Sequence, residues 1–117
     1  MTTQQTAEEI EALTQQVVAA LEDKKASDIL VIDVRGRCPW ADRFVLASGK
    51  TGRQLNAMAQ SMSEIAHQHR MPARIEGLEA MEWLVVDLQD VVVHLFIPEV
   101  RASFQLEQLW TRAKPAA

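Results

Sequence analysis

Two apolar stretches in the second half of the chain limit the choice of fold more than any other feature. They cover residues 83–88 and 91–97, and only Gln89 and Asp90 separate them. Short runs rich in valine, leucine and isoleucine are typical of β-strands, and a two-residue connection joins antiparallel neighbours. The connection contains no glycine or asparagine, so the type of turn stays open. The sequence therefore predicts an antiparallel hairpin over residues 83–97.

The remaining apolar pattern predicts helices and further strands around this hairpin. Continuous apolar runs favour strands buried on both faces, and apolar residues three or four apart favour helices. The predicted order is helix 6–25, strand 29–32, strand 44–47, helix 53–69, strand 73–76, the two hairpin strands, and a final helix opened by Pro98. This order predicts an α/β fold with a mixed five-stranded sheet flanked by helices. With 117 residues, 48% of them apolar, we expect one domain over 1–117 with its core at about 6–112.

Charge and cysteine content exclude several classes of protein. A net charge of −4 argues against unaided binding of nucleic acid, which needs clustered lysine and arginine. Acidic residues outnumber basic ones six to two in residues 1–28 and seven to one in residues 76–107. This excess fits either a face that attracts a basic protein or an ordinary solvated surface. Cys38 is the only cysteine, which excludes an intramolecular disulfide. Without a leader-like start or a membrane-spanning run, we expect a cytoplasmic protein and no membrane partner.

The strongest hint of catalysis is the turn that begins at Ser48 and Gly49, between a predicted strand and a predicted helix. It resembles the phosphate-binding turn of nucleotidyltransferases. Such enzymes also need paired carboxylates on a neighbouring strand, and the predicted strands contain no such pair. A P-loop is excluded because no glycine stands at the first position of the pattern that would end at Gly49 and Lys50. We therefore expect no catalytic, cofactor or metal site, with a divergent nucleotidyltransferase using Ser48 and Gly49 as the alternative.

Polar residues inside the hairpin strands suggest a binding surface. The two-residue period of a strand places Trp83 and Asp87 on one face of the first strand, and His94 and Phe96 together on one face of the second. Aromatic side chains mixed with single charges are typical of protein interfaces. The same pattern fits a sheet face covered by the terminal helix, with Trp83 in the core. Both interpretations stay open on periodicity alone.

Several longer segments carry a family resemblance. They are LEDKKASDILVIDVRG (21–36), ADRFVLASG (41–49), RIEGLEAMEWLVVDLQDVVVHLFIPEVR (74–101) and LEQLW (106–110). Together they resemble the Iojap-type ribosomal silencing factors (RsfS) in the same order over about residues 6–112. The most specific parts are ADRFVLASG, the hairpin and the closing stretch.

The resemblance implies a fold and a function. The fold would be nucleotidyltransferase-like but without metal-binding carboxylates. The function would be binding to ribosomal protein L14 of the large subunit, which sterically blocks the small subunit and represses translation. The implied contact residues are Trp83, Asp87, His94, Glu99, Phe104 and Leu106.

Some matters stay open within the resemblance. A minor contact with ribosomal RNA through Arg35, Arg37 or Arg53 and a homodimer off the ribosome are both left undecided. The sequence also departs from the family pattern. Arg43 and Phe104 stand where tyrosine is usual, and Cys38-Pro39-Trp40 replaces a serine-rich stretch.

Overall fold

The computed structural model describes residues 6–36, 38–39, 41–77 and 82–100. Its elements are α1 (Ala7–Asp23), β1 (Ser27–Asp33), β2 (Arg43–Ser48), α2 (Gly52–Gln68), β3 (Arg74–Glu76), β4 (Trp83–Leu88) and β5 (Val91–Phe96). Residues 98–100 are helical, in agreement with a helix opened by Pro98. The rest of the predicted terminal helix lies outside the described residues. Within those residues, neither α1 nor α2 has the length and apolar composition of a membrane-spanning helix.

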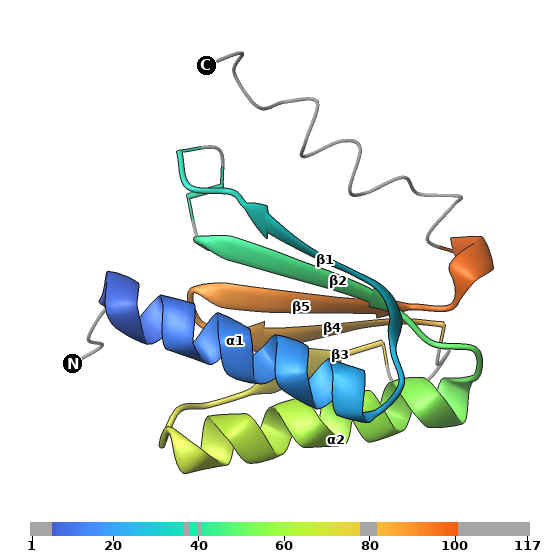
Figure 1. Ribbon diagram of the computed structural model, residues 1–117. Helices are drawn as coiled ribbons and strands as arrows, with labels where there is room; N and C mark the ends of the chain where they lie inside the picture. The colour runs from blue at the N-terminus through green and yellow to red at the C-terminus, as the bar shows by residue number, and fades with distance from the viewer. Residues whose placement is uncertain (1–5, 37, 40, 78–81, 101–117) are drawn as a thin grey trace.

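The five strands form one mixed sheet in the order β1-β2-β5-β4-β3. The central pair, β2 and β5, is parallel, and the other three pairs are antiparallel. Helices α1 and α2 lie side by side on the same face of the sheet (Figure 1). The predicted α/β class and the predicted hairpin are therefore confirmed.

Side-chain caps fix where both helices begin. The Thr6 hydroxyl accepts a hydrogen bond from the Glu9 amide (3.1 Å), and the Glu9 carboxylate accepts one from the Thr6 amide (2.8 Å). The Thr51 hydroxyl accepts from the Gln54 amide in the same way (3.1 Å). The Gln54 side chain also donates to the carbonyl of Lys25 at 3.0 Å, which ties the start of α2 to the chain leaving α1.

The alternating strands divide the apolar residues between two cores, one on each face of the sheet. The core under the helices combines residues of α1 and α2 with Val45, Ala47, Leu84, Val86, Leu88, Val91, Val93 and Leu95 of the sheet. The core on the opposite face contains Ile32, Val34, Cys38, Ala41, Phe44, Leu46, Val92 and Phe96. Trp83 and Val85 are partly buried against this second core. The hairpin residues thus separate by face as the two-residue period predicts.

The prediction that the first strand is buried on both faces was wrong. β1 lies at one edge of the sheet, and Val31 in it is 42% exposed. The register with β2 also shifts between Ser27 and Leu30, where Asp28 has a φ of 53°. Irregularities of this kind are common on edge strands. A continuous apolar run does not distinguish a central strand from an edge strand, because strand order depends on contacts distant in the sequence.

Candidate functional site

The hairpin places the predicted binding residues on the sheet face that points away from α1 and α2. In the β4–β5 pairing, Trp83 lies opposite Phe96 and Val85 lies opposite His94. On the neighbouring strand β2, Phe44 shares a core with Phe96 and belongs to the same face. We call Phe44, Trp83, His94 and Phe96 the aromatic cluster. The prediction that Trp83, His94 and Phe96 share one face of the hairpin is confirmed.

Within the aromatic cluster the rings pack closely around His94. Ring centroids are 4.9 Å apart for Phe44 and His94, 5.3 Å for Trp83 and Phe96, and 6.1 Å for His94 and Phe96. The His94 and Phe96 rings are stacked, with an interplanar angle of 11°. Such distances are those of favourable aromatic contacts. The Trp83 indole Nε1 also donates a hydrogen bond to His94 Nδ1 at 3.4 Å, which fixes the orientation of the indole.

His94 is held neutral by its surroundings. The residue is only 7% exposed, and burial lowers the pKa of its imidazole to about 4. Because Nδ1 accepts the bond from Trp83, the ring proton of the neutral form lies on Nε2. That buried Nε2 has no hydrogen-bond partner among the described residues. An unpaired buried donor costs about 1–3 kcal/mol, so His94 is a polar group kept in the second core at some cost in stability.

Burial decides which members of the aromatic cluster face the outside. Phe96 is fully buried and His94 nearly so, and neither offers a surface to a partner in this conformation. Trp83 is half-buried and is therefore the accessible member. For His94 and Phe96 the structure thus agrees with the interpretation of this face as core. Most of the predicted terminal helix that would cover this face lies outside the described residues.

The remaining predicted contact residues are distributed along the same region. Asp87 lies at the far end of β4 from Trp83, about 13 Å along the strand. It is half-buried, and its Oδ1 accepts a hydrogen bond from the Gln89 amide at 2.9 Å. This bond supports the tight turn, in which Gln89 has a φ of 71°. Glu99 is exposed just after β5, whereas Phe104 and Leu106 lie outside the described residues.

The hydrogen bonds of the turn at Ser48 and Gly49 join it to other parts of the fold. The Gly49 amide donates to the Phe96 carbonyl at 2.8 Å, and the Lys50 amide donates to the Gln54 side chain at 2.7 Å. A Cβ on Gly49 would come within 2.9 Å of a Leu55 methyl group, so close packing accounts for this glycine. Several backbone donors that an anion would need are thus already in use.

No group of three or more histidine, cysteine or acidic side chains is placed to hold a metal ion in the described part of the chain. No contact of the turn therefore favours the divergent nucleotidyltransferase that the sequence left as an alternative.

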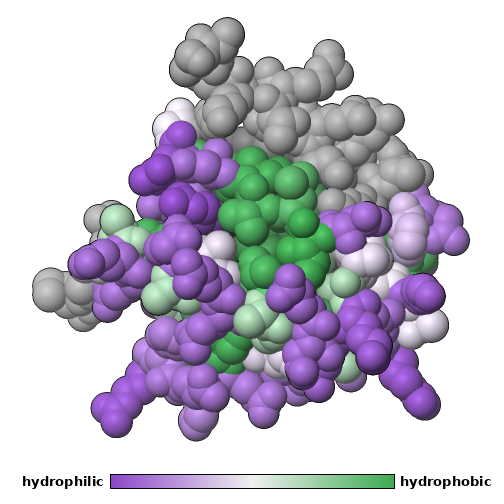
Figure 2. Space-filling view, viewed as in Figure 1, coloured by the Kyte–Doolittle hydropathy of each residue, from purple (hydrophilic) through white to green (hydrophobic). Residues whose placement is uncertain are grey.

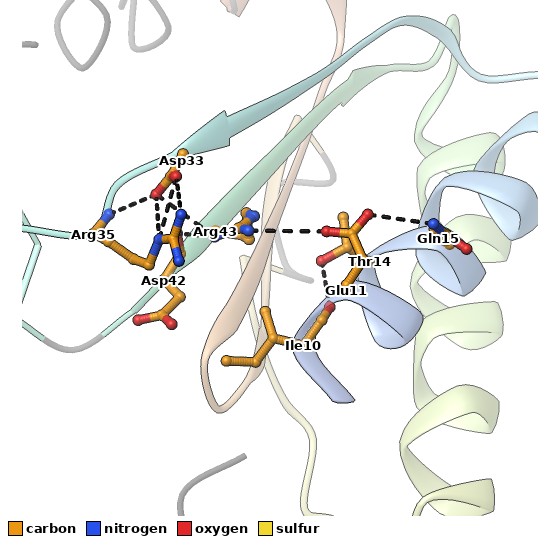
Figure 3. Close-up of polar contacts among 8 residues, drawn as sticks. All are labelled: Ile10, Glu11, Thr14, Gln15, Asp33, Arg35, Asp42 and Arg43. Carbon is orange, nitrogen blue, oxygen red and sulfur yellow. Dashed lines mark hydrogen bonds and ion pairs between the residues drawn. The ribbon is translucent and has the colours of Figure 1, made fainter. Parts of the chain in front are cut away.

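An ionic cluster around Arg43 was not foreseen from the sequence, where Arg43 stood out only as a departure from the family pattern (Figure 3). Its guanidinium lies 3.5 Å from Asp33 on β1 and 3.9 Å from Glu11 on α1. Arg35 contacts the same Asp33 at 2.7 Å, and its side-chain hydrogen bond is the main reason why the pKa of Asp33 falls to about 2. Glu11 is distant in sequence, so only the fold reveals the cluster. Arg35, a candidate RNA contact, is already engaged by a carboxylate.

Comparison with known proteins gives a consistent result. Residues 6–117 match the family described as "Ribosomal silencing factor during starvation". The chain is similar to the ribosomal silencing factor RsfS of Zymomonas mobilis, with 39% identity over 91% of this chain and 80% of that protein. It is also similar to the mouse "Mitochondrial assembly of ribosomal large subunit protein 1", with 36% identity over 81% of this chain but only 43% of that protein.

A solved structure supports the same relationship. The crystal structure of protein CV0518 from Chromobacterium violaceum has a TM-score of 0.84 to this chain at 35% sequence identity. The match covers 92% of this chain and 91% of that one. The structural similarity therefore extends over most of both chains.

Proposed function

The chain belongs to the ribosomal silencing factor family, and from this premise we propose that it binds ribosomal protein L14 on the large subunit and sterically blocks the small subunit. The observation that supports this most directly is the position of Trp83. Its ring is half-buried on a sheet face that α1 and α2 leave uncovered. A large aromatic side chain held in this way is the typical anchor of a protein interface.

In this proposal Trp83 is the contact and its neighbours position it. Phe96 packs against one side of the indole, and His94 accepts the hydrogen bond from its Nε1. An anchor that is already oriented loses less conformational entropy on binding than a free side chain. His94 therefore acts through Trp83, which reconciles its implied role with its burial.

Acidic side chains would supply the complementary charge. Asp87 is half-buried on the same face of the hairpin, and Glu99 is exposed beyond β5. Both would meet basic groups of L14, toward which a chain of net charge −4 is also attracted over longer distances. Phe104 and Leu106 complete the proposed contact set.

The proposed mechanism needs no chemistry. A standard interface buries about 800 Å² on each partner, which a domain of this size can provide. With a radius of gyration of 13.6 Å, a bound domain would occupy space that the small subunit needs. We therefore propose a cytoplasmic, non-enzymatic repressor of translation whose effect saturates with occupancy of the large subunit.

Light scattering during subunit reassociation tests the proposal. Purified large and small ribosomal subunits are mixed at a magnesium concentration that favours joining, with increasing amounts of the protein. We expect the final scattering to fall to a plateau when every large subunit is occupied. Normal reassociation at saturating protein, with binding to large subunits shown by co-sedimentation, would contradict steric blocking.

A further inference from the structure

A surface groove separates α1 from the edge strand β1, on the side of the sheet opposite the aromatic cluster. The groove has a volume of about 340 Å³, and its apolar lining comes from Val18 and Ala19 on α1 and Val31 on β1. Figure 2 shows an apolar patch in this region with hydrophilic residues to its left and right. The exposed fraction of Val31, 42%, is unusual for a valine inside a strand.

The shape of the groove suits an extended peptide. Its helical wall is a single stripe of residues three or four apart, with Glu11 at one end and Glu22 at the other. Eleven residues of helix span about 16 Å, a length that about five residues of extended chain cover.

The opposite wall can receive such a chain. Residues 30–33 of β1 pair regularly with β2, and β1 has no second strand neighbour within the described residues. An edge of this kind accepts another strand through main-chain hydrogen bonds.

The charge around the groove indicates what kind of peptide segment would bind in it. Helix α1 contains five acidic residues and no lysine or arginine between Ala7 and Asp23. The one basic residue lining the groove, Arg43, has only 16% of its side chain exposed and already faces Glu11 and Asp33. A second copy of this protein would bring another acidic α1 toward the first, which like-charge repulsion opposes. A basic segment would instead be attracted.

We propose that the groove between α1 and β1 binds an extended segment of a basic protein, which adds as a further strand beside β1. Alternate side chains of a strand point to the same face, so three of five residues would enter the groove. The central one would be apolar and lie over Ala19 and Val31. The two outer ones would be lysine or arginine and approach Glu11 and Glu22. This site is separate from the aromatic cluster and goes beyond the proposed silencing function.

Peptide titration of the full-length protein tests the pattern. The probe is the peptide Thr-Lys-Thr-Val-Thr-Lys-Thr, and the control is Lys-Lys-Thr-Thr-Thr-Thr-Val, which has the same composition and charge. With the ¹⁵N-labelled protein, we expect the probe to shift the amide signals of Ala19 and Val31 and to bind at least about tenfold more tightly than the control. Equal affinity of the two peptides, or shifts away from α1 and β1, would overturn the proposal.

Two matched variants separate the groove from the general charge of α1. Ala12 and Ala19 are both exposed on this helix, but only Ala19 lines the groove. We expect Ala19→Arg to weaken probe binding about tenfold and Ala12→Arg to leave it unchanged. Equal effects of the two substitutions would count against the site. Sedimentation gives a further decisive result, because a dimer lost only in Ala19→Arg would identify a second copy as the occupant and overturn the basic segment.

Discussion

The two faces of the sheet are built from different kinds of residue, although the same strands supply both. In the core under α1 and α2 the sheet side chains are aliphatic, and those from β2, β4 and β5 are fully buried. The opposite face includes the aromatic cluster, the buried thiol of Cys38 and the half-buried carboxylate of Asp87. A face that served stability alone would gain nothing from the His94 imidazole, whose Nε2 has no partner among the residues that the structure describes. Under the function proposed above, the helix-covered face holds the fold together, whereas the other face would also carry recognition.

The strongest test of this comparison uses Leu84, the neighbour of Trp83 on the helix-covered face. Leu84 is fully buried, so Leu84→Ala should lower the free energy of unfolding by about 2–5 kcal/mol through lost burial and a residual cavity. Urea denaturation followed by circular dichroism measures this. The folded fraction of the variant should still bind large ribosomal subunits with normal affinity. A specific loss of affinity without destabilisation would show that both faces take part in recognition.

Trp83→Ala should produce the opposite pattern. We expect it to weaken binding to large subunits by about 2–4 kcal/mol, the usual loss for a central aromatic anchor. Its effect on unfolding should be smaller than that of Leu84→Ala, because Trp83 is only half-buried. Co-sedimentation with large subunits measures the affinity, and Trp83→Phe serves as the control that keeps an aromatic ring. Unchanged co-sedimentation of Trp83→Ala would remove the main support for recognition through this face.

How far the sequence predicts these faces depends on the range of the interactions involved. The two apolar runs within residues 83–97 and their short connection identified the hairpin. The two-residue period identified the shared face of Trp83 and His94, because a strand imposes that period locally. The cap that the Thr51 hydroxyl forms at the start of α2 is equally local, since its partner Gln54 is three positions later.

Other features depend on contacts between distant segments. The edge position of β1 depends on the order of the strands. The groove beside Val31 and the ionic cluster of Arg43 with Glu11 form where α1 packs on the sheet. Alternation likewise showed which residues share a face but not that His94 is buried while Trp83 remains partly accessible.

The pH dependence of the free energy of unfolding tests what the burial of His94 costs in stability. Burial lowers the pKa of His94 to about 4, below its ordinary value of 6.5, so between these values the unfolded chain binds more protons than the folded one. Stability should therefore fall as the pH decreases from 6.5 toward 4, with a slope of up to about 1.4 kcal/mol per pH unit from this group. In His94→Phe this contribution should disappear. Urea midpoints of both proteins from pH 4.5 to 7 measure it, and parallel curves would contradict a buried neutral imidazole.

The smallest expected effect concerns charge at the far end of the hairpin face. Asp87→Lys replaces an acid with a base on the face proposed to meet basic groups, and it should weaken binding to large subunits by about 1 kcal/mol at moderate salt. The matched control is Glu64→Lys, which makes the same change of charge at an exposed position of α2 on the other side of the sheet. If general charge attraction to the ribosome dominated, the two substitutions would change the affinity by equal amounts, whether they raised it or lowered it. In the proposed complex only Asp87 lies on the contact face, so we expect only Asp87→Lys to weaken binding. The loss of affinity should shrink as salt screens the repulsion.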